Sequence, residues 1–203
     1  MLDQPAIVHF LDACFGAETI DKVVLAVPKS QEKDFEFLVD RFPEIEIFGG
    51  DEEDVLSRFV DASSKYEPET VMRLTSDCFL MQPQIIDECV RMFLDSDLDY
   101  LTNYNLKCTE DDPDDYKSLT ETPDGFCVEI FSYEALKDAH HNATEKYDRE
   151  HVTPWIKRNK RCVAKSSGRL TLTGKLSVDT QEDFDVVESV LELLKQGRIK
   201  VEF

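Results

Sequence analysis

The sequence predicts an α/β fold in which helices cover both faces of a mixed, mostly parallel sheet. Apolar runs of strand length alternate with helical patterns along most of the 203 residues. The run at 21–28 is almost continuously apolar and ends at Pro28, as is typical of a strand with both faces covered. The helix expected at 30–42 and the strand expected at 44–48 complete a strand–helix–strand unit. A chain of this length is sufficient for one domain with a substantial core.

Further elements follow from apolar spacing, turn residues and helix-start signals. Thr153 is expected to cap a helix whose first residue is Pro154. The acidic stretch at 105–121 is expected to be a surface loop, with a lid over the substrate as the alternative. The other helices are expected at 5–15, 54–65, 83–94, 133–140 and 181–196, and the other strands at 70–75, 98–103, 126–131, 162–165 and 175–180.

Composition excludes several classes of function. With 43 acidic and 23 basic residues the formal net charge is −20, which argues against nucleic acid as a partner. The sequence contains no apolar run long enough to cross a membrane, and the first residues lack the pattern of a secretory signal, so we expect a cytoplasmic protein. The six cysteines show no zinc-binding or CxxC spacing and are expected to be reduced thiols, mostly in the core.

Two aspartates follow predicted strands. Asp77 lies between the strand at 70–75 and a helix that begins at Pro83, and Asp179 lies at the end of the strand at 175–180. In open α/β sheets, ligands bind outside the carboxyl ends of the strands. An aspartate before a helix is often only a cap or turn residue. Two such carboxylates, however, suggest that Asp77 and Asp179 converge on one cation.

Magnesium is the cation that suits these carboxylates. It prefers oxygen ligands and is usually bound by one or two carboxylates together with substrate phosphates. Arg73, in the strand before Asp77, is the best remaining cation for a phosphate group. A structural salt bridge is an equally good interpretation of Arg73.

Five motifs in order carry a family resemblance. The chain resembles the sugar-acid cytidylyltransferases, and most closely their branch of spore-coat polysaccharide biosynthesis proteins of the SpsF type. Together the motifs extend over most of the chain. They are GDEEDVLSR at 50–58, RLTSDC at 73–78, PDGFCVEIFS at 123–132, REHVTP at 149–154 and SVDTQED at 177–183.

The resemblance implies a three-layer, Rossmann-like nucleotidyltransferase fold formed by residues 1–203. It also implies an enzyme that activates a sugar acid or related glycan precursor with CTP and Mg²⁺, releasing pyrophosphate, in surface polysaccharide biosynthesis. Asp77 and Asp179 would be the catalytic, metal-binding residues. Glu129 and His151 lie in matched motifs and, with Arg73, would contact the substrate, although His151 is equally plausible as a hydrogen-bonded residue of the fold.

The sequence departs from the family pattern in two places. Members of the family begin with a strand and a basic, glycine-rich loop, and Met1 aligns just after that point, so the domain is expected to be incomplete at its N-terminus. The absent strand would lie in the middle of the sheet, and unpaired edges there would favour self-association, with a homodimer as the candidate assembly. Cys127 stands where this branch usually has aspartate.

Two other functional classes stay open. A nucleotide-sugar glycosyltransferase would also use aspartates after a central strand, but it usually carries Asp-x-Asp, and the sequence around Asp77 is Ser-Asp-Cys. A non-catalytic subunit or interaction module is the second alternative, because the expected nucleotide-binding loop is not in the sequence. Loss of CTP binding with a retained fold would identify this class.

Overall fold

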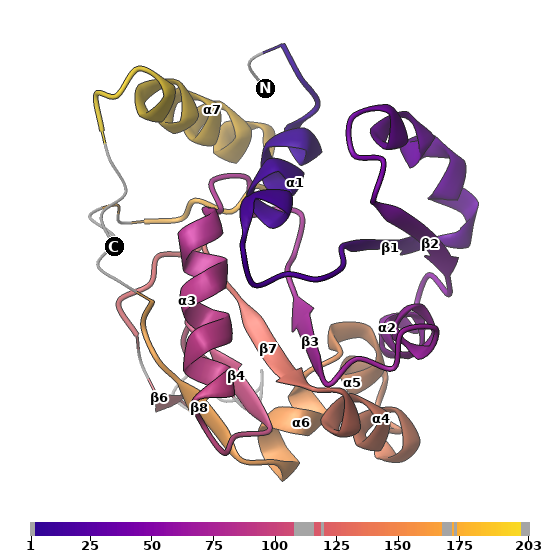
Figure 1. Cartoon of the computed structure of the whole chain (residues 1–203). Coiled ribbons are helices and arrows are strands. Elements are labelled where there is room, and N and C mark those ends of the chain that lie inside the picture. Colours follow the sequence, from indigo (N-terminus) through magenta and orange to yellow (C-terminus); the bar gives the residue numbers. More distant parts are fainter. Residues whose placement is uncertain (1–2, 108–115, 119, 168–171, 173, 200–203) are drawn as a thin grey trace.

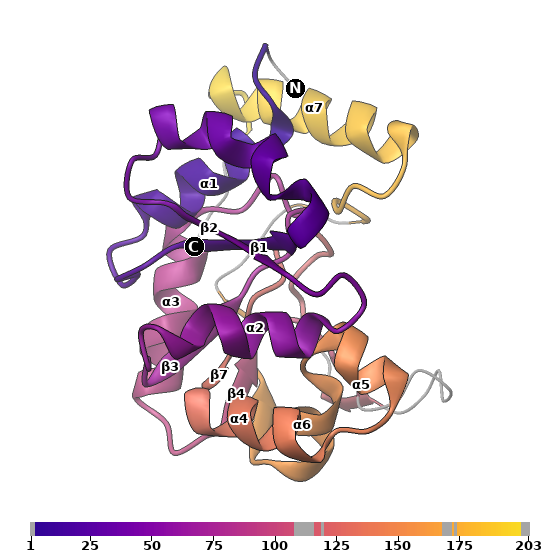
Figure 2. The same cartoon turned by 90° about the vertical axis from the view of Figure 1, so that its right-hand side faces the viewer.

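The computed structural model describes residues 3–107, 116–118, 120–167, 172 and 174–199. Helices flank the strands on both sides, which gives three layers (Figures 1 and 2). One helical layer comprises α1 (Ala6–Gly16), α3 (Pro83–Leu94) and α7 (Gln181–Lys195). The other comprises α2 (Val55–Ser64), α4 (Tyr133–Asn142), α5 (Lys146–His151) and α6 (Pro154–Asn159).

The larger sheet is mixed. Its order is β3 (Thr70–Arg73), β7 (Glu129–Ser132), β4 (Tyr100–Thr102) and β8 (Cys162–Ala164). Only β7 is antiparallel to its neighbours, so β3, β4 and β8 run in one direction. The predicted α/β class with a mixed, mostly parallel sheet is therefore confirmed.

Two further strands form a separate sheet. β1 (Val24–Pro28) pairs in parallel with β2 (Glu46–Gly50), and the segment between them is the 3₁₀ helix η1 (Lys29–Asp40). Within the described part of the chain, no strand pairs with the edge of β1 opposite β2 or with the edge of β3 opposite β7. The strand–helix–strand unit was predicted, and its separation from the larger sheet leaves the unpaired edges that were expected in the middle of the sheet.

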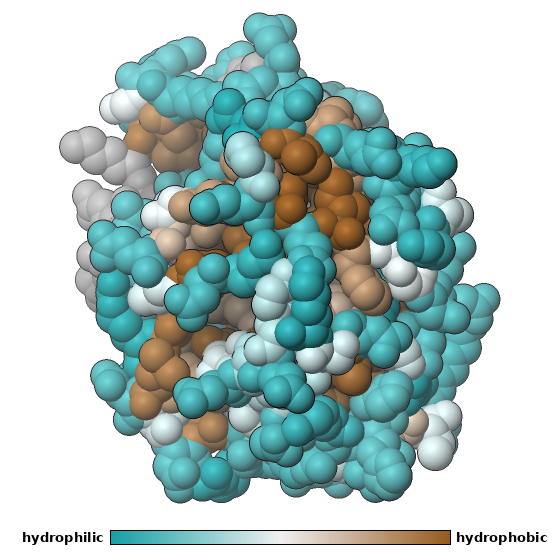
Figure 3. Space-filling model, turned by 45° about the vertical axis from the view of Figure 1, so that its right-hand side comes forward, coloured by the Kyte–Doolittle hydropathy of each residue, from teal (hydrophilic) through white to brown (hydrophobic). Residues whose placement is uncertain are grey.

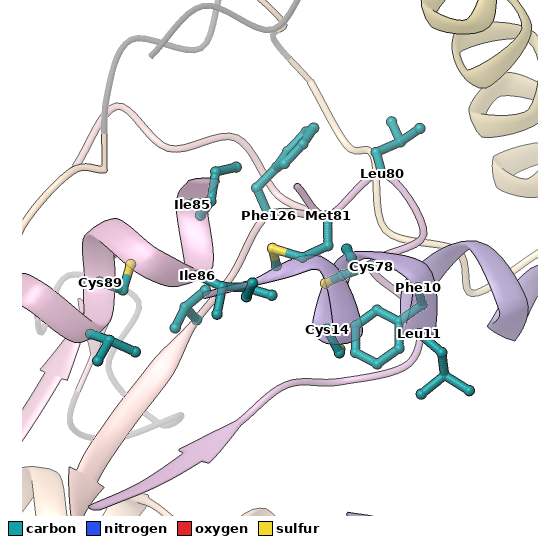
Figure 4. Packing of buried hydrophobic residues seen from close by; sticks show 14 of the residues in the cluster. Phe10, Leu11, Cys14, Cys78, Leu80, Met81, Ile85, Ile86, Cys89 and Phe126 are labelled. Carbon is teal, nitrogen blue, oxygen red and sulfur yellow. The ribbon is translucent and has the colours of Figure 1, made fainter. Parts of the chain in front are cut away.

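The first core cluster lies between the sheet and the α1, α3 and α7 layer. Figure 4 shows side chains of α1 and α3 packed with those of the segment after β3 and with Phe126. Burial of each large apolar side chain contributes about 1.5–3 kcal/mol. The labelled residues are Phe10, Leu11, Cys14, Cys78, Leu80, Met81, Ile85, Ile86, Cys89 and Phe126.

The second core cluster lies on the opposite face of the larger sheet. Leu56 of α2, Leu136 of α4 and Ile156 of α6 are fully buried there. They pack with Tyr100 and Phe131, whose rings are nearly parallel with centroids 6.4 Å apart. Because both faces of the sheet are covered, its strands carry apolar residues on both sides.

Three local predictions were wrong. The segment at 175–180 is not a strand: Lys175 forms a single bridge with Asp124, and Thr180 then caps α7 in a reciprocal capping box with Asp183. Thr153 makes no side-chain cap for α6, because its hydroxyl donates to Glu129 instead. Part of the predicted loop at 105–121 forms a hairpin of β5 (Leu106–Lys107) and β6 (Tyr116–Ser118), while 108–115 and 119 lie outside the described residues.

The surface is largely hydrophilic, with apolar side chains visible between polar ones (Figure 3). Phe37 in η1, Leu94 at the end of α3 and Val186 in α7 are among the exposed large apolar residues. None of the helices in the described ranges is both long and apolar enough to cross a membrane.

Candidate active site

A polar pocket of about 190 Å³ opens where β3 and β4 end and β7 begins. Arg73 and Glu129 are cross-strand partners in the ladder between β3 and β7, so their side chains lie on the same face of the sheet. Thr75 lies two residues after Arg73 and Cys127 two residues before Glu129, and both face the same pocket. The full lining is Arg73, Thr75, Thr102, Tyr104, Asn105, Cys127, Glu129 and Lys157.

Glu129 is the centre of the charge network in this pocket. Its carboxylate forms ion pairs with Arg73 Nη1 at 2.6 Å and with Lys157 Nζ at 2.8 Å. It also accepts hydrogen bonds from Tyr100 Oη and Thr153 Oγ1, each at 2.7 Å. Burial acts to raise the pKa of Glu129, but Lys157 and Arg73 outweigh it and hold the pKa well below its ordinary range. With Glu129 ionised, the two cations leave a net charge of +1.

A strained turn between α5 and α6 lets Thr153 and Lys157 reach Glu129. Val152 has φ +68° and ψ −53°, and the Thr153 amide donates to the His151 carbonyl at 2.8 Å. This is the γ-turn with positive φ, which is rare and strained, particularly for a β-branched residue. Val152 is fully buried, so packing of its side chain compensates for the strain.

Three chain segments meet beside the pocket. The Val178 amide donates to the Asp77 carbonyl at 3.1 Å, which joins the turn after β3 to the segment before α7. The segment before β7 joins them through Asp124, whose carbonyl accepts from the Leu176 amide at 3.1 Å and whose carboxylate accepts from Ser177 Oγ at 2.7 Å. Motifs far apart in the sequence therefore form one site.

A glycine permits this close approach. Gly125 has φ +95°, and a Cβ added to it would lie 2.4 Å from the Leu176 carbonyl carbon. Any side chain at this position would therefore collide with the backbone before α7.

The structure brings the segments of Asp77 and Asp179 together but gives the two side chains different surroundings. Asp77 is half-buried, with the Cys78 thiol 3.7 Å from its carboxylate. Asp179 is exposed, and its carboxylate pairs with Lys175 Nζ at 2.7 Å. Among the residues that are described, no three His, Cys, Asp or Glu side chains are grouped to hold a metal. That Asp77 and Asp179 share one Mg²⁺ stays a prediction.

The family model for cytidylyltransferases matches residues 1–199. The chain belongs to the cytidylyltransferase family. It is 34% identical over 156 residues to an uncharacterised protein of Methanocaldococcus jannaschii and 25% identical over 152 residues to the spore coat polysaccharide biosynthesis protein SpsF of Bacillus subtilis. These matches cover 74% and 72% of the chain. The chain spans only 56% and 57% of the length of these two relatives.

Solved structures support the fold. A cytidylyltransferase from Leptospira borgpetersenii serovar Hardjo-bovis superposes with a TM-score of 0.75 at 21% identity, covering 97% of this chain and 85% of its own. CMP:2-keto-3-deoxy-manno-octonic acid synthetase, solved with CTP, gives a TM-score of 0.65 at 13% identity, covering 94% and 89% of the two chains. At these identities the likeness concerns the fold alone.

Of the three predicted substrate contacts, Arg73 and Glu129 line the pocket and His151 does not. The His151 ring instead packs against Tyr147, with centroids 4.4 Å apart. Its contact with substrate stays a prediction. The sequence analysis did not identify Lys157, which lies in none of the matched motifs. It also did not single out Asp124, which lies in the motif at 123–132.

A further ion pair explains two of the matched motifs structurally. Asp54 caps α2 by accepting from the Ser57 amide at 2.9 Å, and its carboxylate also accepts from Arg149 Nε at 3.1 Å. Arg149 Nη1 continues to the His140 carbonyl at 2.8 Å. The motifs at 50–58 and 149–154 therefore fasten α2 to α5 and α4.

Proposed function

We propose that this chain transfers a cytidylyl group from CTP to a sugar acid or related acidic glycan precursor and releases pyrophosphate. The observation that supports an acidic acceptor is the pocket in which Arg73 and Lys157 both pair with Glu129. The net positive charge of this group within a chain of charge −20 favours an anionic ligand. The similarity to the spore coat polysaccharide biosynthesis protein SpsF and to CMP:2-keto-3-deoxy-manno-octonic acid synthetase supports such an acceptor in surface polysaccharide synthesis.

The reaction requires positioning more than covalent chemistry from the protein. A hydroxyl oxygen of the acceptor forms a bond to the α-phosphorus of CTP while the bond to pyrophosphate breaks, and the hydroxyl proton passes to water. Arg73 and Lys157 would hold the acceptor carboxylate, and the hydroxyl and amide groups of Thr75, Thr102 and Asn105 would orient its hydroxyls. Asp77 and Asp179 would hold Mg²⁺, which would offset the charge of the triphosphate.

Lys157→Met tests the role of the pocket in acceptor binding. Pyrophosphate release from CTP is measured with Mg²⁺ and a panel of sugar acids and matched neutral sugars, in a chain to which the N-terminal strand and basic loop of the family pattern have been joined. We expect release to require an acid, and Lys157→Met to raise the KM for that acid by roughly tenfold or more, because a charge-assisted contact contributes about 1.5–3 kcal/mol. Lys160→Met is the matched control, since Lys160 follows α6 and pairs with Asp138 outside the pocket.

Two outcomes would contradict the proposal. Equal turnover of neutral and acidic sugars would show that the enzyme does not require an acidic acceptor. A folded chain that neither binds CTP nor releases pyrophosphate with any acceptor would support a non-catalytic subunit instead.

A further inference from the structure

One oxygen of Glu129, Oε1, is shared by three donors. Tyr100 Oη and Thr153 Oγ1 each donate to it at 2.7 Å, and Lys157 Nζ lies 2.8 Å from it. The other oxygen, Oε2, pairs with Arg73 Nη1 at 2.6 Å. An ionised carboxylate offers about four lone-pair sites over its two oxygens, so the two hydroxyls are sufficient to satisfy Oε1. The ammonium of Lys157 is therefore the donor that this oxygen can spare.

Thr153 and Lys157 approach Glu129 from the same turn of helix. The Lys157 amide donates to the Thr153 carbonyl at 3.0 Å, so the two residues lie one turn apart at the start of α6. Thr153 is only 1% exposed and does not line the pocket, whereas Lys157 does. The threonine hydroxyl thus binds Glu129 from a buried position, while the ammonium lies at the pocket.

Tyr100 supplies the second hydroxyl and also supports Lys157. Its side chain is fully buried, and Lys157 Nζ lies 5.5 Å from the centre of its ring, which is within the range of a cation–π contact. Burial raises the pKa of Tyr100 well above its ordinary value, and Glu129 raises it further. The Tyr100 hydroxyl therefore keeps its proton and donates to Glu129.

We propose that Thr153 is a positioning residue, which keeps Glu129 satisfied and so lets Lys157 turn from Glu129 to the acidic group of the substrate. This role deepens the proposed function and rests on its acidic acceptor. Without the threonine hydroxyl, Oε1 keeps only Tyr100 besides Lys157, and the ammonium binds Glu129 more tightly. Glu129 then competes with the acid for the same cation, and the affinity for the acid falls.

Calorimetric titration of the 203-residue chain without CTP tests this role, because every residue that lines the pocket belongs to the chain. The acidic probes are glucuronate, galacturonate and 2-keto-3-deoxy-manno-octonic acid, and the neutral probes are glucose and galactose. We expect Thr153→Val to raise the Kd of the acid that binds by about threefold to tenfold and to leave neutral sugars unaffected. Thr153→Ser keeps the hydroxyl and should restore the wild-type Kd.

The decisive comparison is made in a Lys157→Met background. If Thr153 acts through Lys157, Thr153→Val changes the Kd there by less than about twofold, whereas a purely structural role gives the same factor in both backgrounds. Thr122→Val is the matched control and should bind the acid as the wild type does. Thr122 is also a buried threonine, but its hydroxyl has no hydrogen-bond partner within the described part of the chain.

Tyr100→Phe keeps the test decisive if Thr153→Val fails to fold. It removes the other hydroxyl from Oε1, retains the ring beneath Lys157 and should raise the Kd of the acid by a similar factor. The proposal is overturned if either variant, once folded, binds the acid like the wild type, or weakens acid and neutral sugar alike.

Persistence of the Thr153→Val effect in the Lys157→Met background also overturns the proposal, as does a wild-type chain that binds none of the acids. Acid binding with the expected coupling between Thr153 and Lys157, but without pyrophosphate release from CTP, would support the positioning role while counting against cytidylyl transfer alone.

Discussion

At the scale of single residues, the candidate site depends on one buried carboxylate and its two cations. Glu129 stays ionised because Arg73 and Lys157 compensate for the loss of water around it. The strand position of Glu129 was predictable, since alternation along 126–131 places it with Arg73. Lys157 was not, because its approach depends on the γ-turn at Val152, which only tertiary packing sustains.

Replacement of Glu129 by glutamine leaves the two cations without their carboxylate. Because one half of a buried ion pair is lost, we expect the free energy of unfolding to fall by about 3–5 kcal/mol in urea titrations. Glu134→Gln is the control, since the Glu134 side chain is 80% exposed and pairs only with Lys137 at 2.5 Å. Exposed pairs contribute about 0–1 kcal/mol.

The pH dependence of stability distinguishes the charge of Glu129 from its packing. The pKa of Glu129 is lower in the folded than in the unfolded chain, so its contribution is fully present above the ordinary value of 4.5 and is lost as pH falls towards the folded value. Wild-type stability should therefore fall more steeply than that of Glu129→Gln between about pH 5 and pH 3. Parallel curves would show that the pKa of Glu129 is the same in the folded and the unfolded chain.

At the scale of elements, the order of strands and helices was predictable, because the spacing of apolar residues and the position of turn residues are local features of the sequence. The segment at 175–180 has the composition of a strand but forms a single β-bridge. Its amides donate to carbonyls of two different segments, Leu176 to Asp124 and Val178 to Asp77, so no continuous ladder forms. The helix α5 was not predicted, because contacts of Arg149 with Asp54 and His140, rather than local sequence signals, hold it in place. Tertiary hydrogen bonds, which local sequence does not encode, decided both cases.

Gly125→Ala tests the junction between β7 and the segment before α7. A methyl group at Gly125 meets the Leu176 backbone and also requires a positive φ, whereas Gly174, with φ +104°, has no atom within 4 Å of such a Cβ. Gly174→Ala is therefore the matched control, with a cost of about 1–2 kcal/mol from backbone strain alone. We expect Gly125→Ala to cost clearly more in urea titrations. Equal losses in the free energy of unfolding for the two variants would mean that the backbone at the junction can shift to accommodate the methyl group without further strain.

At the scale of the whole molecule, the separation of the β1–β2 pair from the larger sheet is the main feature that elements alone do not explain. We propose that a further strand belongs between β1 and β3, as the family resemblance implies. Helices cover both faces of the larger sheet, and the side chains of β1 are mostly half-buried. Local sequence predicted β1, β2 and the strands of the larger sheet, but which edges pair depends on segments distant in the chain.

Hydrogen exchange measures these edges directly. A strand with one partner has only alternate amides in ladder hydrogen bonds, so alternate amides of β1 should exchange much faster than those of β7, which has a partner on each side. Exposed edges also favour pairing between copies. We therefore expect the fast amides of β1 and β3 to become protected as protein concentration rises, in step with dimer formation in sedimentation experiments. Uniform protection of the amides of residues 24–27 in a dilute monomer would show that the edge of β1 is already closed and would remove both the open slot and this route to a homodimer.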